Sequence, residues 1–208
     1  MFALKAPAWR GATKFLIGLA LASLASETTG ASALAASLPG PGSAAPALTL
    51  PSLDGPPLSL AALHGRPVVV HFFATWCEPC REELSGLSHL AARLDPTTGP
   101  MILAVDVGEV PVRVRRFLDR QFKDAGLGFP VLIDEDRAAS RAFGVTVLPA
   151  TLLLDPAHII RRTAEGPIDW DHPDARAALD HLSTSTATPD AAPLPPLTDR
   201  EPPHDQPS

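Results

Sequence analysis

The sequence predicts an α/β domain built on a central mixed sheet with helices on its flanks. Two apolar, β-branched runs, Val68–Phe73 and Met101–Val107, have the composition of buried parallel strands. A third observation is the pair of apolar runs Thr151–Leu154 and Ile159–Thr163, which four residues separate. Two strands joined by so short a turn form an antiparallel hairpin, so we expect both strand directions in one sheet.

A short hairpin is expected ahead of the first central strand. Leu48–Leu50 and Leu58–Leu60 flank Asp54-Gly55, a dipeptide typical of turns. Residues 61–67 then lead directly into the strand at Val68.

The strand at 68–73 leads into Trp76-Cys77-Glu78-Pro79-Cys80, which holds the only two cysteines of the chain. From Arg81 to Leu94, apolar residues recur with the spacing of one helical face. The cysteine pair therefore lies where a strand gives way to a helix. Unpaired backbone N–H groups and the positive end of the helix dipole favour a thiolate there, and a thiolate is the species that attacks a disulfide.

A purely structural role for the cysteine pair would leave several features without a reason. A structural zinc site would need a second pair of ligands, and the sequence has no further cysteine and no histidine pair at finger spacing. A structural disulfide that closes so short a loop would stabilise the fold little. Two incidental buried thiols would not account for the strand–helix junction. A C-x-x-C beside a βαβ pattern is the signature of redox chemistry.

The elements after the second strand follow from the same periodicities. A helix is expected from Pro111, a residue suited to a first helical turn, through Ala125. A short strand follows at 129–133, then a short helix at 137–143 that Gly144 ends. Residues 173–182 form the last expected helix.

Residues 1–36 have the architecture of an export signal. Lys5, Arg10 and Lys14 precede the apolar run Phe15–Ala25, and small residues typical of a cleavage site follow. The apolar run is shorter than the roughly 20 residues that cross a bilayer, which favours a cleaved signal peptide over a permanent signal anchor. Either form would carry the protein out of the cytoplasm and into a compartment where disulfides persist.

Composition limits the rest of the chain to one domain. With 208 residues, of which 45% are hydrophobic and 19% charged, the chain can form one globular domain at 48–182. Residues 37–47 have the composition of a mobile linker, and 183–208 that of a disordered proline-rich tail. The net charge of −6 gives no basic footprint for nucleic acid.

The stretch VHFFATWCEPCR, residues 70–81, resembles the active-site segment of thioredoxin-fold proteins, in particular the TlpA/ResA-like family of exported thiol–disulfide oxidoreductases. The resemblance extends from about Pro46 to Leu182. It implies a thioredoxin fold with an N-terminal β-hairpin and a central helix–strand insertion. The expected helix and strand between 111 and 133 resemble that insertion.

The resemblance and the helix position together suggest roles within the redox motif. Cys77, at the helix start, is expected to attack the client disulfide, and Cys80, one turn further, to resolve the mixed disulfide. Trp76 is expected to shield the pair, or else to serve as a packing residue. Glu78 and Pro79 are expected to tune the reduction potential. A carboxylate at Glu78 would oppose a Cys77 thiolate and favour a reductant, unless solvent screens its charge.

Leu148-Pro149 stands where thioredoxin-like folds carry a cis-proline facing the two sulfurs. The resemblance alone supports a cis bond here, since about 5–6% of such bonds are cis. The backbone of Leu148 would then offer an edge for pairing with a client peptide. Relatives often carry threonine after this proline, and this chain has Ala150.

Two further residues have competing interpretations. Glu109 aligns with an acid that ResA-like proteins place near the disulfide, where it could hold or relay a proton; otherwise it is an ordinary acid in the first turn of a helix. His71 stands where relatives commonly have asparagine. It could accept the proton of Cys80, or it could be a neutral, hydrogen-bonded core histidine, which is the favoured interpretation.

The resulting hypothesis is a monomeric extracytoplasmic reductase of protein disulfides that needs no cofactor or metal. By resemblance, its clients would be apocytochrome c or copper-site cysteines, and a membrane thiol reductant of the DsbD/CcdA type would supply electrons. The alternatives are a copper carrier that uses both thiolates and a disulfide oxidant of the DsbA type. A peroxiredoxin would need proline and threonine or serine where Val70 and Ala74 stand.

Overall fold

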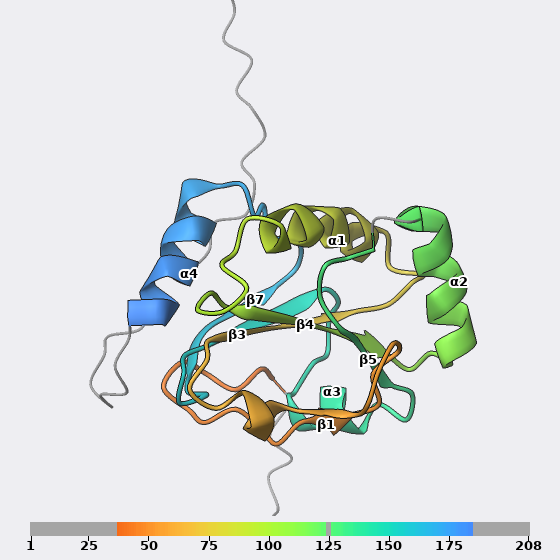
Figure 1. Ribbon diagram of the computed structural model, residues 1–208. Coiled ribbons are helices and arrows are strands. Elements are labelled where there is room, and N and C mark those ends of the chain that lie inside the picture. Colours follow the sequence, from red (N-terminus) through yellow and green to blue (C-terminus); the bar gives the residue numbers. More distant parts are fainter. Residues whose placement is uncertain (1–36, 124–125, 185–208) are drawn as a thin grey trace, which may run out of the picture. The chain divides into compact units, whose positions relative to one another are not determined.

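The computed structural model describes residues 37–123 and 126–184. Their centre is a five-stranded mixed sheet with the strand order β5-β4-β3-β6-β7 (Figure 1). β3, β4 and β5 run parallel, whereas β6 is antiparallel to both β3 and β7. The predicted α/β class and mixed sheet are therefore confirmed. The strands are β3 (Val68–Phe73), β4 (Met101–Val107), β5 (Val131–Asp134), β6 (Ala150–Leu154) and β7 (Ile160–Glu165).

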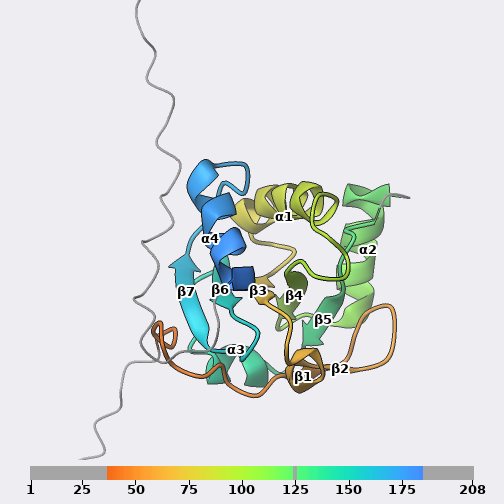
Figure 2. The same cartoon turned by 60° about the vertical axis from the view of Figure 1, so that its left-hand side comes forward.

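Helices cover both faces of this sheet, and the two faces pack separate cores. Val69 and Phe73 of β3 point into a core that α1, α2 and α4 close, and Val70 and Phe72 point into one that β1, the 3-10 helix and α3 close. Figure 1 shows α1 above the sheet and β1 with α3 below it, and Figure 2 shows α4 beside β6 and β7. The helices are the 3-10 helix Leu60–Leu63, α1 (Glu78–Ala91), α2 (Pro111–Gln121), α3 (Ala138–Ala142) and α4 (Pro173–Thr184).

The expected N-terminal hairpin is present as β1 (Thr49–Leu50) paired antiparallel with β2 (Leu58–Ser59). The segment between these strands binds the edge of the main sheet, because Leu53 N–H donates to Val131 O and Ile133 N–H donates to Pro51 O at 2.8 and 3.0 Å.

The prediction that residues 37–47 form a mobile linker is wrong. Ala44 forms an antiparallel bridge with Ile159, and Gly42 N–H and Ser43 O exchange hydrogen bonds of 2.8 and 2.9 Å with the backbone of Ile160. β7 is the last strand of the sheet, so its outer edge has backbone groups that need partners, and this segment supplies them. Proline and glycine composition did not reveal that edge.

Several predicted boundaries move by a few residues. α2 ends at Gln121 instead of Ala125, since Lys123 adopts a φ of +42° that no α-helix accommodates. α1 starts at Glu78 and ends at Ala91, three residues before the predicted end at Leu94. Gly144 ends α3 as expected, with a φ of +66°, and a side chain there would collide with the backbone of Ser37.

The predicted export signal and most of the predicted C-terminal tail, residues 1–36 and 185–208, lie outside the described residues. Within 37–123 and 126–184, no helix combines the length and the apolar character needed to cross a membrane.

Candidate active site

Cys77 and Cys80 form a disulfide at the N-terminus of α1. Cys77 is the N-cap residue of the helix, and its Sγ accepts a hydrogen bond from the backbone N–H of Cys80 at 3.4 Å. Cys77 keeps 6% of its surface exposed, whereas Cys80 is fully buried. A thiolate at Cys77 would gain both this donor and the positive end of the helix dipole. The burial therefore favours Cys77 as the thiol that a client can reach.

Glu78 lies between the cysteines with its side chain in solvent. Its carboxylate forms an ion pair with Arg81, Oε2 to Nη1, at 2.6 Å, and 69% of the Glu78 side chain is exposed. Pro79 occupies the first turn of α1, where the lack of a backbone N–H costs nothing. The nearby guanidinium and the solvent weaken the expected effect of the Glu78 charge on the disulfide.

Three loops meet at the end of the sheet where the disulfide lies. Phe73 of β3 pairs with Asp106 of β4, and Phe72 pairs with Ala150 of β6, so the segments that follow β3 and β4 and the one that precedes β6 are neighbours. All the large hydrophobic side chains that are exposed in the described residues lie in these segments or in the first turn of α2. They are Trp76, Val110, Val112 and Val147, which we call the apolar rim.

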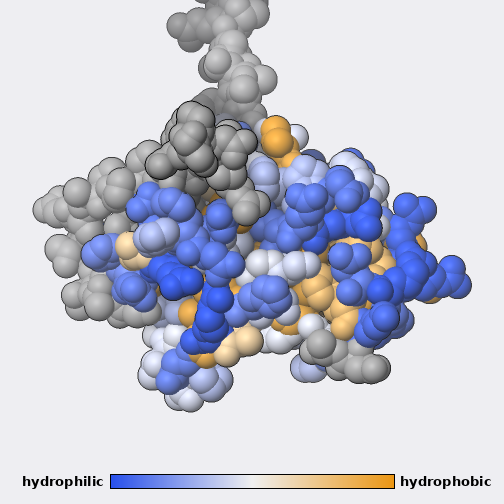
Figure 3. All heavy atoms as spheres, turned by 90° about the horizontal axis from the view of Figure 1, so that it is seen from above, coloured by the Kyte–Doolittle hydropathy of each residue, from blue (hydrophilic) through white to orange (hydrophobic). Residues whose placement is uncertain are grey.

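Trp76 is the most exposed member of the apolar rim, with 63% of its surface in solvent. It is therefore not the packing residue that one interpretation of the sequence allowed. Seen from above, over α1, most of the surface is hydrophilic and hydrophobic atoms form small patches (Figure 3). An exposed indole beside a reactive sulfur can contact a partner protein.

The peptide bond between Leu148 and Pro149 is cis, as the resemblance implied. Pro149 is buried, and its carbonyl accepts a hydrogen bond of 2.8 Å from Gly166 N–H. The register between β3 and β6 extends only to Ala150, so Leu148 lies beyond the paired part of β6.

Glu109 binds the segment that precedes the disulfide. Its carboxylate accepts hydrogen bonds from the backbone N–H and the hydroxyl of Thr75, at 2.6 and 2.8 Å, and Arg113 Nη1 lies 3.6 Å away. The residue is 5% exposed and stands before α2, so it is not a solvated first-turn acid. Because Thr75 is two residues from Cys77, Glu109 fixes the loop that leads to the disulfide.

His71 is a fully buried residue of β3. Its Nδ1 lies 3.0 Å from the Thr151 hydroxyl and 3.6 Å from Glu83 Oε1, and Nε2 has no hydrogen-bond partner among the described residues. Burial lowers the pKa of His71 to about 3, so the ring is neutral at physiological pH. This arrangement supports the interpretation as a neutral core histidine.

Glu83 was not identified from the sequence, although it lies three residues after Cys80 on the buried face of α1. Its Oε1 accepts a hydrogen bond of 2.9 Å from the indole N–H of Trp170, and Oε2 has no partner among the described residues. Burial raises the pKa of Glu83 to about 8, an effect that the Trp170 hydrogen bond partly offsets. The signal in the sequence was an acid at a position where helical spacing expects an apolar residue.

Asp106 is a second buried acid that the sequence did not reveal. It lies near the end of β4 and pairs in register with Phe73 and Ile133. Neither of its carboxyl oxygens has a hydrogen-bond partner in the described part of the chain. Burial, followed by the negative charge of Glu109, raises the pKa of Asp106 to about 8.

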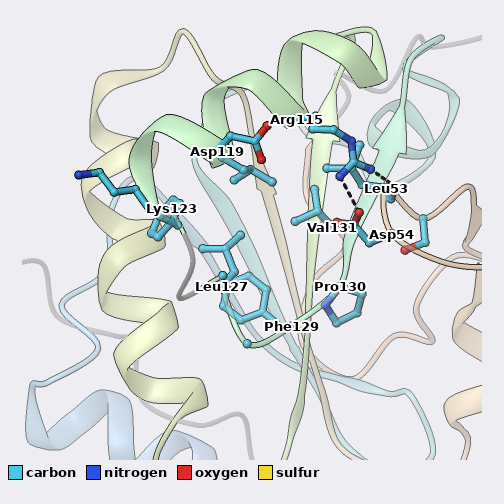
Figure 4. Close-up of a pocket in the computed structure, with 14 residues that line it drawn as sticks. Leu53, Asp54, Arg115, Asp119, Lys123, Leu127, Phe129, Pro130 and Val131 are labelled. Carbon is cyan, nitrogen blue, oxygen red and sulfur yellow. Dashed lines mark hydrogen bonds and ion pairs between the residues drawn. The ribbon is translucent and has the colours of Figure 1, made fainter.

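A cavity of about 590 Å³ lies away from these groups, between α2, the loop before β5 and the segment at 52–54. Figure 4 shows Arg115 at its upper edge, bonded to Asp54 Oδ1 and to the carbonyl of Leu53 at 2.6 and 2.5 Å. None of the residues that line it belongs to the cysteine motif or to the apolar rim.

No three histidine, cysteine, aspartate or glutamate side chains are grouped as metal ligands within the described ranges. The copper-carrier alternative therefore gains no third ligand from this part of the chain.

The sequence model of the AhpC/TSA family matches residues 41–163. Among curated proteins, the chain is 34% identical over 99 residues to the thiol-disulfide oxidoreductase ResA of Bacillus subtilis, an alignment that covers 48% of this chain and 52% of that protein. It is 35% identical over 99 residues to ResA of Geobacillus thermodenitrificans, covering 48% and 54% of the two chains. The chain spans about half the length of the curated relatives that it matches.

Solved structures agree with the fold. A Chlorobium tepidum protein assigned as the thiol:disulfide interchange protein DsbE superposes with a TM-score of 0.62 at 23% identity, over 71% of this chain and 99% of that one. A Neisseria meningitidis protein assigned as a thioredoxin gives 0.59 at 26% identity, over 72% and 94%. These neighbours confirm the predicted thioredoxin fold; whether the segment around α2 and β5 is the expected insertion stays a prediction.

Proposed function

Because the chain belongs to the AhpC/TSA family and is similar to ResA proteins, we propose that it is an extracytoplasmic thiol–disulfide oxidoreductase that reduces protein disulfides through Cys77 and Cys80. The observation that carries this proposal is the disulfide at the N-terminus of α1, in which Cys80 is fully enclosed and Cys77 keeps 6% of its surface exposed. The names of the ResA relatives and of the DsbE-like neighbours support the reaction type.

The geometry supports a two-step exchange. In the reduced protein, the Cys77 thiolate attacks one sulfur of the client disulfide, and the other client sulfur leaves as a thiolate that takes a proton. Cys80 then loses its proton and attacks Cys77, which releases the client thiol and forms the disulfide seen here. A membrane dithiol reductant of the DsbD/CcdA type would return two electrons to the pair.

Cys80 needs a group that accepts its proton in the second step. Glu83 is the nearest buried acid along the same helix, one turn after Cys80, and its pKa of about 8 is suited to proton exchange near neutral pH. The indole N–H of Trp170 holds the Glu83 carboxyl in place at 2.9 Å, and the neutral ring of His71 lies 3.6 Å from the same oxygen.

The apolar rim defines the kind of client that this site accepts. Exposed apolar side chains around a buried disulfide favour an extended, partly unfolded segment with apolar residues beside its cysteines. The backbone of Leu148, beyond the paired part of β6, is available for pairing with such a segment. Apocytochrome c and copper-site proteins before metal insertion would present cysteines in this way.

Replacing Trp76 with alanine should weaken client binding by about tenfold, which corresponds to about 1.4 kcal/mol, since tryptophan is enriched among the interface residues whose truncation costs more than 1 kcal/mol. The measurement is KM for an unfolded protein that carries one disulfide, compared with the rate of reaction with dithiothreitol, which reports the cysteines alone. Trp76→Phe should restore most of the affinity. A KM that Trp76→Ala leaves unchanged would remove Trp76 from the client surface.

The reduction potential of the Cys77–Cys80 couple tests the direction of electron flow. We expect a value well below the roughly −120 mV of the oxidant DsbA, measured in glutathione or dithiothreitol buffers. Glu78→Gln should shift it towards oxidising values by only about 10 mV, because an exposed ion pair contributes about 0.5 kcal/mol. A potential near that of DsbA would instead support the oxidant alternative.

A further inference from the structure

The carboxyl of Asp106 is surrounded by acids and has no cation against it among the described residues. Glu109 and Asp134 are the charged groups that act on it, and both oppose its ionisation. Asp134 acts on Asp106 only through its charge, whereas Glu109 also contacts it by a hydrogen bond. The two Asp134 oxygens accept the backbone N–H groups of Ala139 and Ser140 at 2.9 and 2.7 Å. The nearest guanidinium groups serve other partners: Arg113 faces Glu109 at 3.6 Å, and Arg137 lies against Gly108.

Asp106 is fully buried, and its oxygens lack a well-formed hydrogen bond among the described residues. The backbone N–H of Glu109 offsets only part of the cost of a buried carboxylate, and protonation removes that cost. A protonated Asp106 also gains an O–H donor, and the carboxylate of Glu109 is the acceptor that faces it. Glu109 already accepts two hydrogen bonds from Thr75, both from groups that carry no charge. A third donor from Asp106 would complete the contacts of a carboxylate that is 5% exposed.

We propose that Asp106 and Glu109 hold one proton between them, with Asp106 O–H donating to the Glu109 carboxylate, and that reduction of the Cys77–Cys80 disulfide increases the affinity of this pair for that proton. The pair thus positions the loop of Thr75 and senses the charge on Cys77. The part of the proposal that concerns reduction rests on the proposed function. Asp106 acts through Glu109 and Thr75, so it is a positioning residue.

The link to reduction follows from charge. A dithiol that reduces the Cys77–Cys80 disulfide transfers two electrons and two protons and becomes a disulfide itself. If the Cys77 thiol then ionises, it releases one of these two protons. Below pH 8 the pair carries one negative charge in both redox states. Above pH 8 it carries two, and a thiolate at Cys77 is then repelled unless the pair takes up the released proton. Reduction should therefore become harder at high pH than in a protein with a neutral side chain at 106.

The first test follows the proton directly. In the oxidised protein with ¹³C-labelled aspartate, one carboxyl resonance should titrate near pH 8 and should be missing in Asp106→Asn. Because only aspartate carries the label, Glu83, whose pKa is also about 8, adds no signal. In Glu109→Gln the same resonance should titrate at lower pH, because the charge that opposes ionisation of Asp106 is gone. If every aspartate titrates below pH 5, the shared proton is excluded, and this result needs neither a client nor a foldable variant.

The second test measures the redox equilibrium of the Cys77–Cys80 pair as a function of pH. The equilibrium constant for reduction by dithiothreitol should agree between wild type and Asp106→Asn at pH 6–7, and above pH 8 the wild type should become several-fold harder to reduce. Glu135→Gln, a neutralised exposed acid just after β5, is the control and should follow the wild type. Superimposed curves for wild type and Asp106→Asn up to pH 9.5 would overturn the redox link. If the aspartate titration and the redox shift are both observed but the protein does not turn over protein disulfides, the shared proton stands and only the proposed function is contradicted.

Discussion

Replacing Cys80 with alanine is expected to abolish disulfide turnover and to trap clients on Cys77 as mixed disulfides. Cys77, at the N-cap of α1, keeps 6% of its surface exposed, whereas Cys80 is fully enclosed. Without Cys80 nothing in the protein can attack the mixed disulfide, so the intermediate persists. Turnover should fall by at least three orders of magnitude, measured as reduction of a protein disulfide, as is typical when a covalent nucleophile or its partner is removed.

Cys77→Ala is the matched control for this experiment. It should be equally inactive and should form no mixed disulfide, since the remaining thiol is buried. Non-reducing electrophoresis separates the two outcomes. Trapping by Cys77→Ala and not by Cys80→Ala would reverse the roles of the two cysteines.

Replacing Glu83 with glutamine is expected to stabilise the oxidised protein, and the gain should grow with pH. The pKa of Glu83 is about 8 in the folded protein and 4.5 as a reference value for the unfolded chain. The acid therefore binds a proton more tightly when folded, and its contribution to stability is complete below pH 4.5 and is lost as pH rises to 8. Glutamine has no proton to lose, so the difference at pH 8 should be on the order of 2–4 kcal/mol.

The experiment compares denaturant unfolding of wild type, Glu83→Gln and Glu82→Gln between pH 4 and 9. Glu82 is the exposed neighbour on α1, and its variant should follow the wild type at every pH. Equal stability loss in Glu83→Gln at all pH values would show that the carboxyl is ionised and paired in the folded state.

His71 gives the opposite dependence on pH. Its pKa is lowered from 6.5 to about 3, so its stabilising contribution is complete above pH 6.5 and disappears as pH falls towards 3. His71→Asn should therefore flatten the acid side of the stability curve, even if the smaller side chain lowers stability as a whole. An unchanged slope between pH 6.5 and 4 would place a charged imidazole in the folded protein.

Much of the fold was predictable from the sequence because each core strand carries its own signal. Val68–Phe73 and Met101–Val107 are apolar runs buried on both faces, and the structure has these strands with the same boundaries. The start of α1 at the cysteine pair and the turn at Gly144 follow equally from local chemistry. The cis bond before Pro149 came only from the resemblance, since no local signal distinguishes it.

The buried acids were not predictable because their environments come from distant segments. Glu83 lies beside Trp170 and His71, and Asp106 beside Glu109 and Asp134, from different elements of the fold. In a single sequence Glu83 and Asp106 stand out only as acids at positions where the local period expects an apolar residue, and their partners cannot be read from it. Glu109 shows the same limit, because its bonds to Thr75 connect segments that 34 positions separate.

The segment at 37–47 also limits how the molecule can associate. An uncovered outer strand offers a row of backbone donors and acceptors to any other chain with a free edge, and such pairing leads to aggregation. Backbone groups at or just before the start of β7 are already hydrogen-bonded to Gly42, Ser43 and Ala45. The next residues of the strand are Arg161 and Arg162. A protein trimmed to begin at residue 48 would expose the start of that edge. We therefore expect this short proline- and glycine-rich stretch to limit edge-to-edge pairing of the domain with other chains.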